Sequence, residues 1–107
     1  MRSKIIIFAL SLLLSALAFA DSGKAVYEQV CATCHASGVM DAPKLYDKEA
    51  WGPRLAQGRD KLISHSDYGY KAMPAHGGND SLSDKDVEMA VDYMIIQVGG
   101  YSKKSSQ

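Results

Sequence analysis

The run Cys31-Ala32-Thr33-Cys34-His35 is the feature that most constrains this chain. Two cysteines three positions apart, followed directly by a histidine, are typical of a c-type haem attachment site. In such a site each thiol adds to one vinyl group of the haem, and one tight turn brings both sulfur atoms to the same porphyrin edge. The adjacent histidine lies under the iron, which its imidazole nitrogen can bind. The motif therefore predicts one covalent haem c, held by Cys31 and Cys34, with His35 as an axial ligand.

A CxxC pair has two other common uses, in zinc binding and in thiol redox chemistry. A structural zinc site needs four ligands, and the sequence has no second CxxC and no HxxxH to complete one. A thioredoxin-like redox pair belongs in a strand-helix-strand pattern, and no strands of that kind are visible around residue 31. Because the sequence around the pair fits neither of these uses, it favours haem attachment.

Length and charge are consistent with this interpretation. The chain has 107 residues, which favours one small domain. It has only two cysteines, and a covalent haem would use both, so no disulfide is expected. The 12 basic and 12 acidic residues balance, which argues against nucleic acid as a partner.

The N-terminus predicts export. Arg2 and Lys4 precede the apolar run 5–20, which ends in Ala18-Phe19-Ala20, the layout of a secretory signal peptide with its cleavage site. An uncleaved membrane anchor is the alternative, but the run is shorter than the ~20 apolar residues of a spanning helix, and two serines interrupt it. We therefore expect a signal peptide over 1–20, a periplasmic protein, and no transmembrane segment in the mature chain.

After residue 20 we expect short helices separated by loops. Loops are expected over 36–46 and 71–82, where glycine and proline interrupt the pattern. Pro53 is expected to begin a new turn, because proline is tolerated at a first helical position. Four helices are expected. The first starts after Ser22 and runs into the haem motif, and the second follows a cap at Asp47. The third covers 59–68, and the fourth follows a cap at Ser83.

The last of these helices has the clearest pattern. Ser83 and Asp86 form a variant of the capping box, and Gly99-Gly100 is expected to end the helix. The polar tail over 99–107 is expected to be flexible. One apolar stripe is expected to face the core, formed by Val87, Ala90, Val91, Met94 and Val98.

The second axial ligand is open on residue chemistry. Met73 lies in the loop segment Lys71-Ala72-Met73-Pro74, where it serves no helical stripe and could reach over the haem face opposite His35. Imidazole is also a strong iron ligand, so His65 and His76 are the alternatives. Loop position favours Met73.

Beyond the haem motif, a longer ordered set of residues resembles the class I cytochromes c, and among them the cytochrome c5 family. The resemblance covers nearly all of residues 21–98, which we expect to be the cytochrome domain. The residues that carry it are Val26-Tyr27, His35-Ala36-Ser37-Gly38, Ala42-Pro43-Lys44-Leu45, Trp51-Gly52-Pro53-Arg54-Leu55-Ala56-Gln57-Gly58, Ala72-Met73-Pro74, Gly77-Gly78, Leu82-Ser83-Asp84 and Ala90-Val91-Asp92-Tyr93-Met94.

The resemblance implies an all-α fold in which helices pack around one covalent haem and the first and last helices cross. Gly23 and Tyr27 would then meet Ala90 and Tyr93. That contact would explain a glycine on an apolar helix face, where it costs ~1 kcal/mol against alanine. Fraying at the helix start is the other explanation for Gly23.

The resemblance also implies roles for three residues near the haem. The Pro43 carbonyl would accept the proton on the far nitrogen of His35 and so fix the orientation of the ring. Trp51 and Arg54 would lie near the haem propionates, where a donor and a cation suit carboxylates. Plain core packing is an equally good interpretation of Trp51.

One segment departs from the family pattern. Many cytochromes c5 carry an extra cysteine pair just after the Met-Pro-x-x-Gly-Gly segment, whereas this chain has Asn79-Asp80-Ser81 there. No disulfide can clamp the loop at this point. We therefore expect the loop that carries Met73 to be more mobile than in those relatives.

A haem with histidine and methionine ligands has no open position for oxygen chemistry, and the methionine raises its reduction potential. We therefore expect a monomeric single-electron carrier, not an enzyme, whose partners are redox proteins such as a terminal oxidase or reductase. A haem peroxidase or gas sensor is the alternative, which would require Met73 to leave the iron. A structural subunit of a larger redox complex is a third possibility, which a long interaction segment would favour.

Overall fold

The structure is a computed structural model, which describes residues 22–100. Within that part of the chain it is helical and contains no strand, as the all-α prediction requires; Tyr70 and Met73 form an isolated bridge. The elements are a helical start over 22–26, η1 (Tyr27–Cys31), α2 (Ala32–His35), η2 (Val39–Asp41), α3 (Lys48–Leu55), α4 (Arg59–Tyr68), η3 (Ala75–Gly78) and α5 (Asp84–Gln97).

The first helix runs without interruption from residue 22 to the end of the haem motif. Its middle section, η1, is a π-helical turn in which the amide of Ala32 donates to the carbonyl oxygen of Tyr27. Such wide turns inside α-helices often occur at functional sites. Here the wide turn ends at Cys31, the first cysteine of the motif.

Residue 23 lies where the first helix crosses α5. Gly23 is buried, and a Cβ atom built on it would lie 2.5 Å from the carbonyl oxygen of Met89. One turn further on, the rings of Tyr27 and Tyr93 pack with centroids 5.4 Å apart. The crossing that the family resemblance implied is therefore confirmed at Tyr93, while the backbone of Met89, next to the expected Ala90, lies closest to Gly23. Close helix contact explains the glycine.

Helix α3 begins at the predicted cap, since the amide of Ala50 donates to Oδ1 of Asp47 at 3.2 Å. The prediction that Pro53 starts a new turn is wrong, because Pro53 lies inside α3. Pro53 cannot donate to the carbonyl of Glu49. Both residues are exposed, so water can serve that carbonyl and the helix continues to Leu55.

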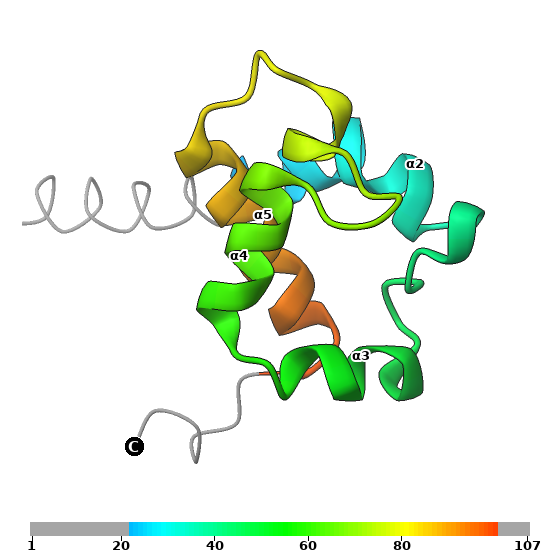
Figure 1. The fold of residues 1–107 in the computed structure, drawn as a ribbon. Helices are drawn as coiled ribbons and strands as arrows, with labels where there is room; N and C mark the ends of the chain where they lie inside the picture. Colours follow the sequence, from blue (N-terminus) through cyan, green and yellow to red (C-terminus); the bar gives the residue numbers. More distant parts are fainter. Residues whose placement is uncertain (1–21, 101–107) are drawn as a thin grey trace, which may run out of the picture.

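Helices α4 and α5 lie side by side (Figure 1). The bounds of α4 match the prediction over 59–68. At its first residue, Arg59 donates through Nε and Nη2 to both carboxylate oxygens of Asp92 at 2.7 and 2.9 Å, and through Nη2 to Oε1 of Glu88 at 2.6 Å. This planar two-point contact fixes the end of α4 against α5.

Both ends of α5 are capped as predicted. The amide of Asp86 donates to Oγ of Ser83 at 3.1 Å, and the amide of Ser83 donates to Oδ2 of Asp86 at 3.0 Å. At the other end Gly99 has φ +75°, and the amides of Gly99 and Gly100 donate back to Ile96 and Ile95. These two bonds form a Schellman motif, which satisfies the last carbonyls of the helix.

The core has two parts, both built on α5. Its five predicted stripe residues are all buried, and Ile95, which the prediction left out, is only 1% exposed. One cluster lies near the haem motif and contains Tyr27, Leu45, Trp51, Met94 and Val98. The other lies under α4 and contains Val87, Val91 and Ile95, with Leu55, Leu62, Ile63 and Leu82 against it.

The predicted loops over 36–46 and 71–82 contain only the short turns η2 and η3. No helix among residues 22–100 is long and apolar enough to cross a membrane. The predicted signal peptide over 1–20 lies outside the described residues, as does the predicted tail from residue 101 onward. The signal peptide and the flexibility of the tail therefore stay predictions.

Candidate haem-binding site

The two cysteines lie on neighbouring turns of the first helix. Cys31 ends η1 and Cys34 lies in α2; both are half-buried and neither is in a disulfide. Residues three apart on a helix face the same side, so one flat group can meet both sulfur atoms. Burial raises the pKa of the Cys31 thiol to about 11, with a smaller effect from Cys34, so this thiol is protonated at neutral pH.

His35 is buried and held at two points. Its Nδ1 lies 2.8 Å from the carbonyl oxygen of Pro43, and its own carbonyl accepts from the amide of Leu45 at 2.9 Å. Because a carbonyl can only accept, Nδ1 carries the proton, and in the neutral ring Nε2 then carries a lone pair. Burial is the main reason why the pKa of His35 is lowered; the Pro43 carbonyl opposes this, and the charge of Arg54 adds to it. The ring is therefore neutral at neutral pH, as an iron ligand must be.

Trp51 and Arg54 both lie on α3, and Trp51 packs beside His35. The indole ring of Trp51 is 6% exposed and its centroid lies 5.9 Å from that of His35. Its Nε1 donates to the carbonyl of Lys44 at 2.8 Å, so this structure shows the core-packing role. Arg54 is half-buried and donates through Nη1 to the carbonyl of Ala50 at 2.6 Å. A role for either residue at the haem propionates stays a prediction.

Met73 is held in a tight loop that packs on the first helix. Reciprocal amide-carbonyl bonds of 2.9 Å join it to Tyr70, and Lys71 between them has φ +52°. A Cβ atom built on Gly77 would lie 2.8 Å from Cγ1 of Val30, directly before Cys31. The fold therefore brings the Met73 loop against the helix that carries the cysteines.

The two competing histidines have partners elsewhere. His65 stacks on Tyr70 with ring centroids 3.8 Å apart and an interplanar angle of 6°. His76 places Nε2 at 2.9 Å from Oδ1 of Asp84, on α5. These contacts give each histidine a role other than iron ligand, which favours Met73.

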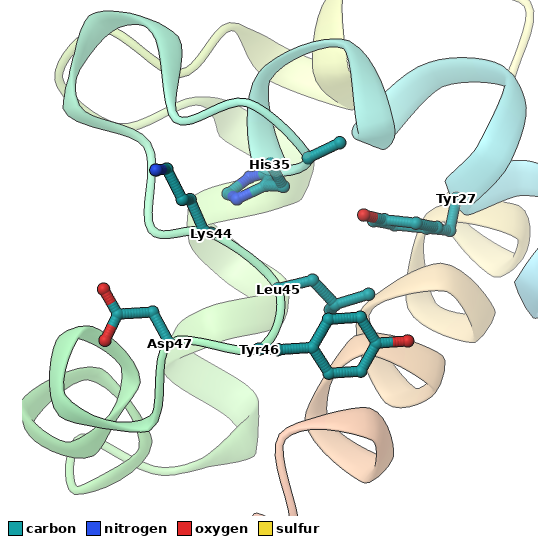
Figure 2. A pocket seen from close by; sticks show the side chains of 7 residues that line it. Tyr27, His35, Lys44, Leu45, Tyr46 and Asp47 are labelled. Carbon is teal, nitrogen blue, oxygen red and sulfur yellow. The ribbon is translucent and has the colours of Figure 1, made fainter.

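A cavity of about 430 Å³ borders His35 (Figure 2). Its lining comes from the first helix and from the segment that follows Pro43. The lining residues are Tyr27, His35, Ala36, Lys44, Leu45, Tyr46 and Asp47. None of these lining residues belongs to the Met73 loop.

Two contacts at the site were not predicted. The carbonyl of Lys44 accepts the indole proton of Trp51, and Leu45 is 4% exposed in the core cluster beside the motif. Both residues belong to the family-like run after Ala42, but the loop has no periodicity from which their roles could be inferred.

The donors fit a c-type haem by their chemistry. The site has two thiols one turn apart and a neutral imidazole with Nε2 available, and a thioether is carried on an adjacent loop. The helical fold and the CxxCH motif together define a c-type cytochrome.

Comparisons with known proteins agree with that class. Residues 18–94 match the family model described as cytochrome C oxidase, cbb3-type, subunit III. The chain is 52% identical to cytochrome c-555 of Chlorobaculum tepidum over 94 residues, which cover 81% of this chain and 87% of the relative. It is 36% identical to cytochrome c5 of Azotobacter vinelandii over 77 residues, covering 70% and 93%.

A solved structure also matches, a chain from the electron transfer complex of nitrite reductase with cytochrome c. Its TM-score is 0.68 at 44% identity, with 72% of this chain and 94% of that chain covered. The chain belongs to the class I monohaem cytochromes c. The family resemblance and the haem c cofactor are thus confirmed. The relatives of this chain are electron-carrier cytochromes c, not enzymes. Relatives named cytochrome c-555 reach higher identity than those named cytochrome c5.

Proposed function

We propose that this chain is a periplasmic electron carrier in which Cys31 and Cys34 attach one haem c, with His35 and Met73 as its axial ligands. When bound, the haem supplies reversible one-electron chemistry at iron. The observation that carries this proposal is the bond from Nδ1 of His35 to the Pro43 carbonyl, which leaves Nε2 as the nitrogen with a free lone pair.

The chain's own residues hold these ligands in place. Pro43 fixes the tautomer and the plane of His35, while Trp51 packs beside the ring and keeps it buried. The Tyr70 bridge and the extended backbone at Pro74 hold Met73 in its loop. Arg54 provides a half-buried cation whose charge acts on His35, and a cation of this kind suits a propionate.

The partners we propose are redox enzymes such as a terminal oxidase or a reductase. The structurally similar cytochrome c chain comes from a complex with nitrite reductase, which supports a partner of this kind. Electron transfer needs only a brief, close contact, so the interface should be small. We further propose that residues 1–20 are a cleaved signal peptide, that 21–98 form a monomeric cytochrome domain, and that 99–107 are a tail.

The first experiment tests attachment and export together. Mass spectrometry of the purified protein should give the chain from Asp21 plus one haem, and acidified organic solvent should extract no haem. A mass equal to the bare chain, or extractable haem, would overturn attachment at Cys31 and Cys34. A mass that includes residues 1–20 would overturn cleavage alone.

The second experiment tests the carrier role. The reduced protein should be oxidised rapidly by a catalytic amount of terminal oxidase with oxygen as the final electron acceptor, or of nitrite reductase with nitrite, and slowly by hydrogen peroxide alone. Both rates are followed in the visible spectrum of the same sample. Rapid peroxide turnover by the wild-type protein would overturn the carrier role in favour of a haem peroxidase.

A further inference from the structure

Three potential metal ligands from distant parts of the chain meet away from the haem motif. Asp67 lies in the last turn of α4, His76 in η3, and Asp84 is the first residue of α5. One ligand atom from each lies within 4.8 Å of the others. Nε2 of His76 and Oδ1 of Asp84 are 2.9 Å apart.

One carboxylate oxygen of Asp67 lacks a hydrogen-bond partner within the described part of the chain. Its Oδ1 atom is buried and has no hydrogen-bond partner among the described residues. A buried carboxylate oxygen without a partner is costly, and it needs an explanation. Burial, and next the charge of Asp84, raise the pKa of Asp67, while His76 acts in the opposite direction. The geometry therefore leaves Oδ1 of Asp67 buried without a partner among residues 22–100, next to a histidine and a second carboxylate.

We propose that Asp67, His76 and Asp84 bind one divalent transition-metal ion of the zinc type, with water completing its coordination. An imidazole nitrogen with carboxylate oxygens is a common zinc ligand set, whereas Ca²⁺ and Mg²⁺ prefer oxygen ligands alone. The site is reachable, because the Asp84 side chain is 76% exposed and that of His76 is 21% exposed.

The geometry requires only a small adjustment. Zinc–oxygen and zinc–nitrogen bonds of about 2.0–2.1 Å place tetrahedral ligand atoms about 3.3 Å apart. His76 and Asp84 are already closer than that, and the third ligand atom lies within 4.8 Å. The exposed side chain of Asp84 can rotate, so the three atoms can close around an ion while the backbone stays in place.

A bound ion would join the Met73 loop to the two long helices. His76 lies three residues after Met73, and the ion would link it to α4 through Asp67 and to α5 through Asp84. The alternative is that His76 and Asp84 form only a direct ion pair, with no metal. The metal site and the direct ion pair differ in their expected behaviour: only the metal site should bind zinc with one ion per chain and be stabilised by it.

The test is calorimetric titration of Zn²⁺ into the purified holoprotein, without an affinity tag and after treatment with a chelator. We expect one zinc per chain, and a loss of affinity of about 10-fold or more in His76→Asn and in Asp84→Asn, since even indirect supporting contacts are worth that much. His65→Asn and Asp80→Asn are matched controls outside the cluster and should bind as the wild type does. Zinc should also raise the melting temperature of the wild type and not that of Asp84→Asn.

Zinc K-edge absorption identifies the ligands, separately from the haem iron. The expected spectrum has one imidazole and otherwise oxygen ligands. The proposal is overturned if no stoichiometric zinc binds, or if His76→Asn and Asp84→Asn bind as the wild type does. Equal losses in His65→Asn would show an adventitious ion only. The haem spectrum of each variant checks its fold. Should His76→Asn fail to fold, Asp84→Asn alone tests the proposal, because the Asp84 side chain is exposed and its replacement should not disturb the fold.

Discussion

A Cβ atom on Gly23 would lie 2.5 Å from the carbonyl oxygen of Met89 and 3.3 Å from Cβ of Tyr93. The first helix therefore crosses α5 with its backbone directly against that of the other helix. This contact anchors the helix that carries both cysteines and His35, so the position of the haem motif depends on a residue without a side chain.

Gly23→Ala should destabilise the holoprotein by about 1–3 kcal/mol, because the clash is with rigid backbone and outweighs the ~1 kcal/mol that alanine gains in helix propensity. Guanidinium unfolding measures the change. Gly52→Ala is the control: Gly52 lies inside α3, and among the described residues nothing apart from its own helix backbone and chain neighbours lies within 4 Å of its built Cβ. Because the ring of Pro53 disfavours a helical residue with a side chain directly before it, the usual gain of alanine over glycine is offset, and little net change in stability is expected. If Gly23→Ala were as stable as the wild type, the close crossing would be wrong.

Met73→Ala should open the sixth position of the iron, lower the reduction potential and allow carbon monoxide to bind. Visible spectra and potentiometry follow these changes. Met40→Ala is the control, since Met40 is 74% exposed and lies in η2, and it should leave both unchanged. If Met73→Ala kept the sulfur-to-iron charge-transfer band and the wild-type ferric spectrum, His65 or His76 would become the better candidate.

Tyr27 should make stability depend on pH in the alkaline range. Burial, and next the charge of Tyr93, raise the pKa of Tyr27 above its usual value near 10. Folding then favours the protonated phenol, so its contribution is fully present below pH 10 and is lost as the pH rises through the folded pKa. Tyr27→Phe cannot ionise and should lose less stability than the wild type above pH 10. Parallel denaturant titrations of both proteins from pH 8 to pH 11 test this, and an unchanged difference across that range would contradict it.

Ser83→Ala should cost about 1 kcal/mol, because it removes the oxygen that accepts from the amide of Asp86 at the start of α5. Thermal or denaturant unfolding of the holoprotein measures the loss. Ser81→Ala changes an exposed serine two residues earlier and should have little effect. Equal stability of the two variants would mean that the cap does not contribute.

Local features of the fold were predictable from the sequence. The haem motif, the cap at Asp47, the bounds of α4, the capping box and the glycine stop of α5 each depend on residues within a few positions of one another. The prediction for Pro53 failed because proline is compatible with a first turn and also with an exposed helix interior. Ile95 was left out of the stripe although it lies four residues after Val91, on the same face of α5, so the helical period could have identified it.

The sequence by itself determined the haem motif, the class of protein and most helix ends, because these depend on short-range chemistry and backbone geometry. Only the tertiary structure decided which groups separated along the chain come together. It placed Trp51 beside the ring of His35 and brought Asp67, His76 and Asp84 to one point, whereas the bond from Nδ1 of His35 to the carbonyl of Pro43 was already implied by the family resemblance. Such contacts follow from how helices cross and loops close, and side-chain periodicity does not encode distances between elements.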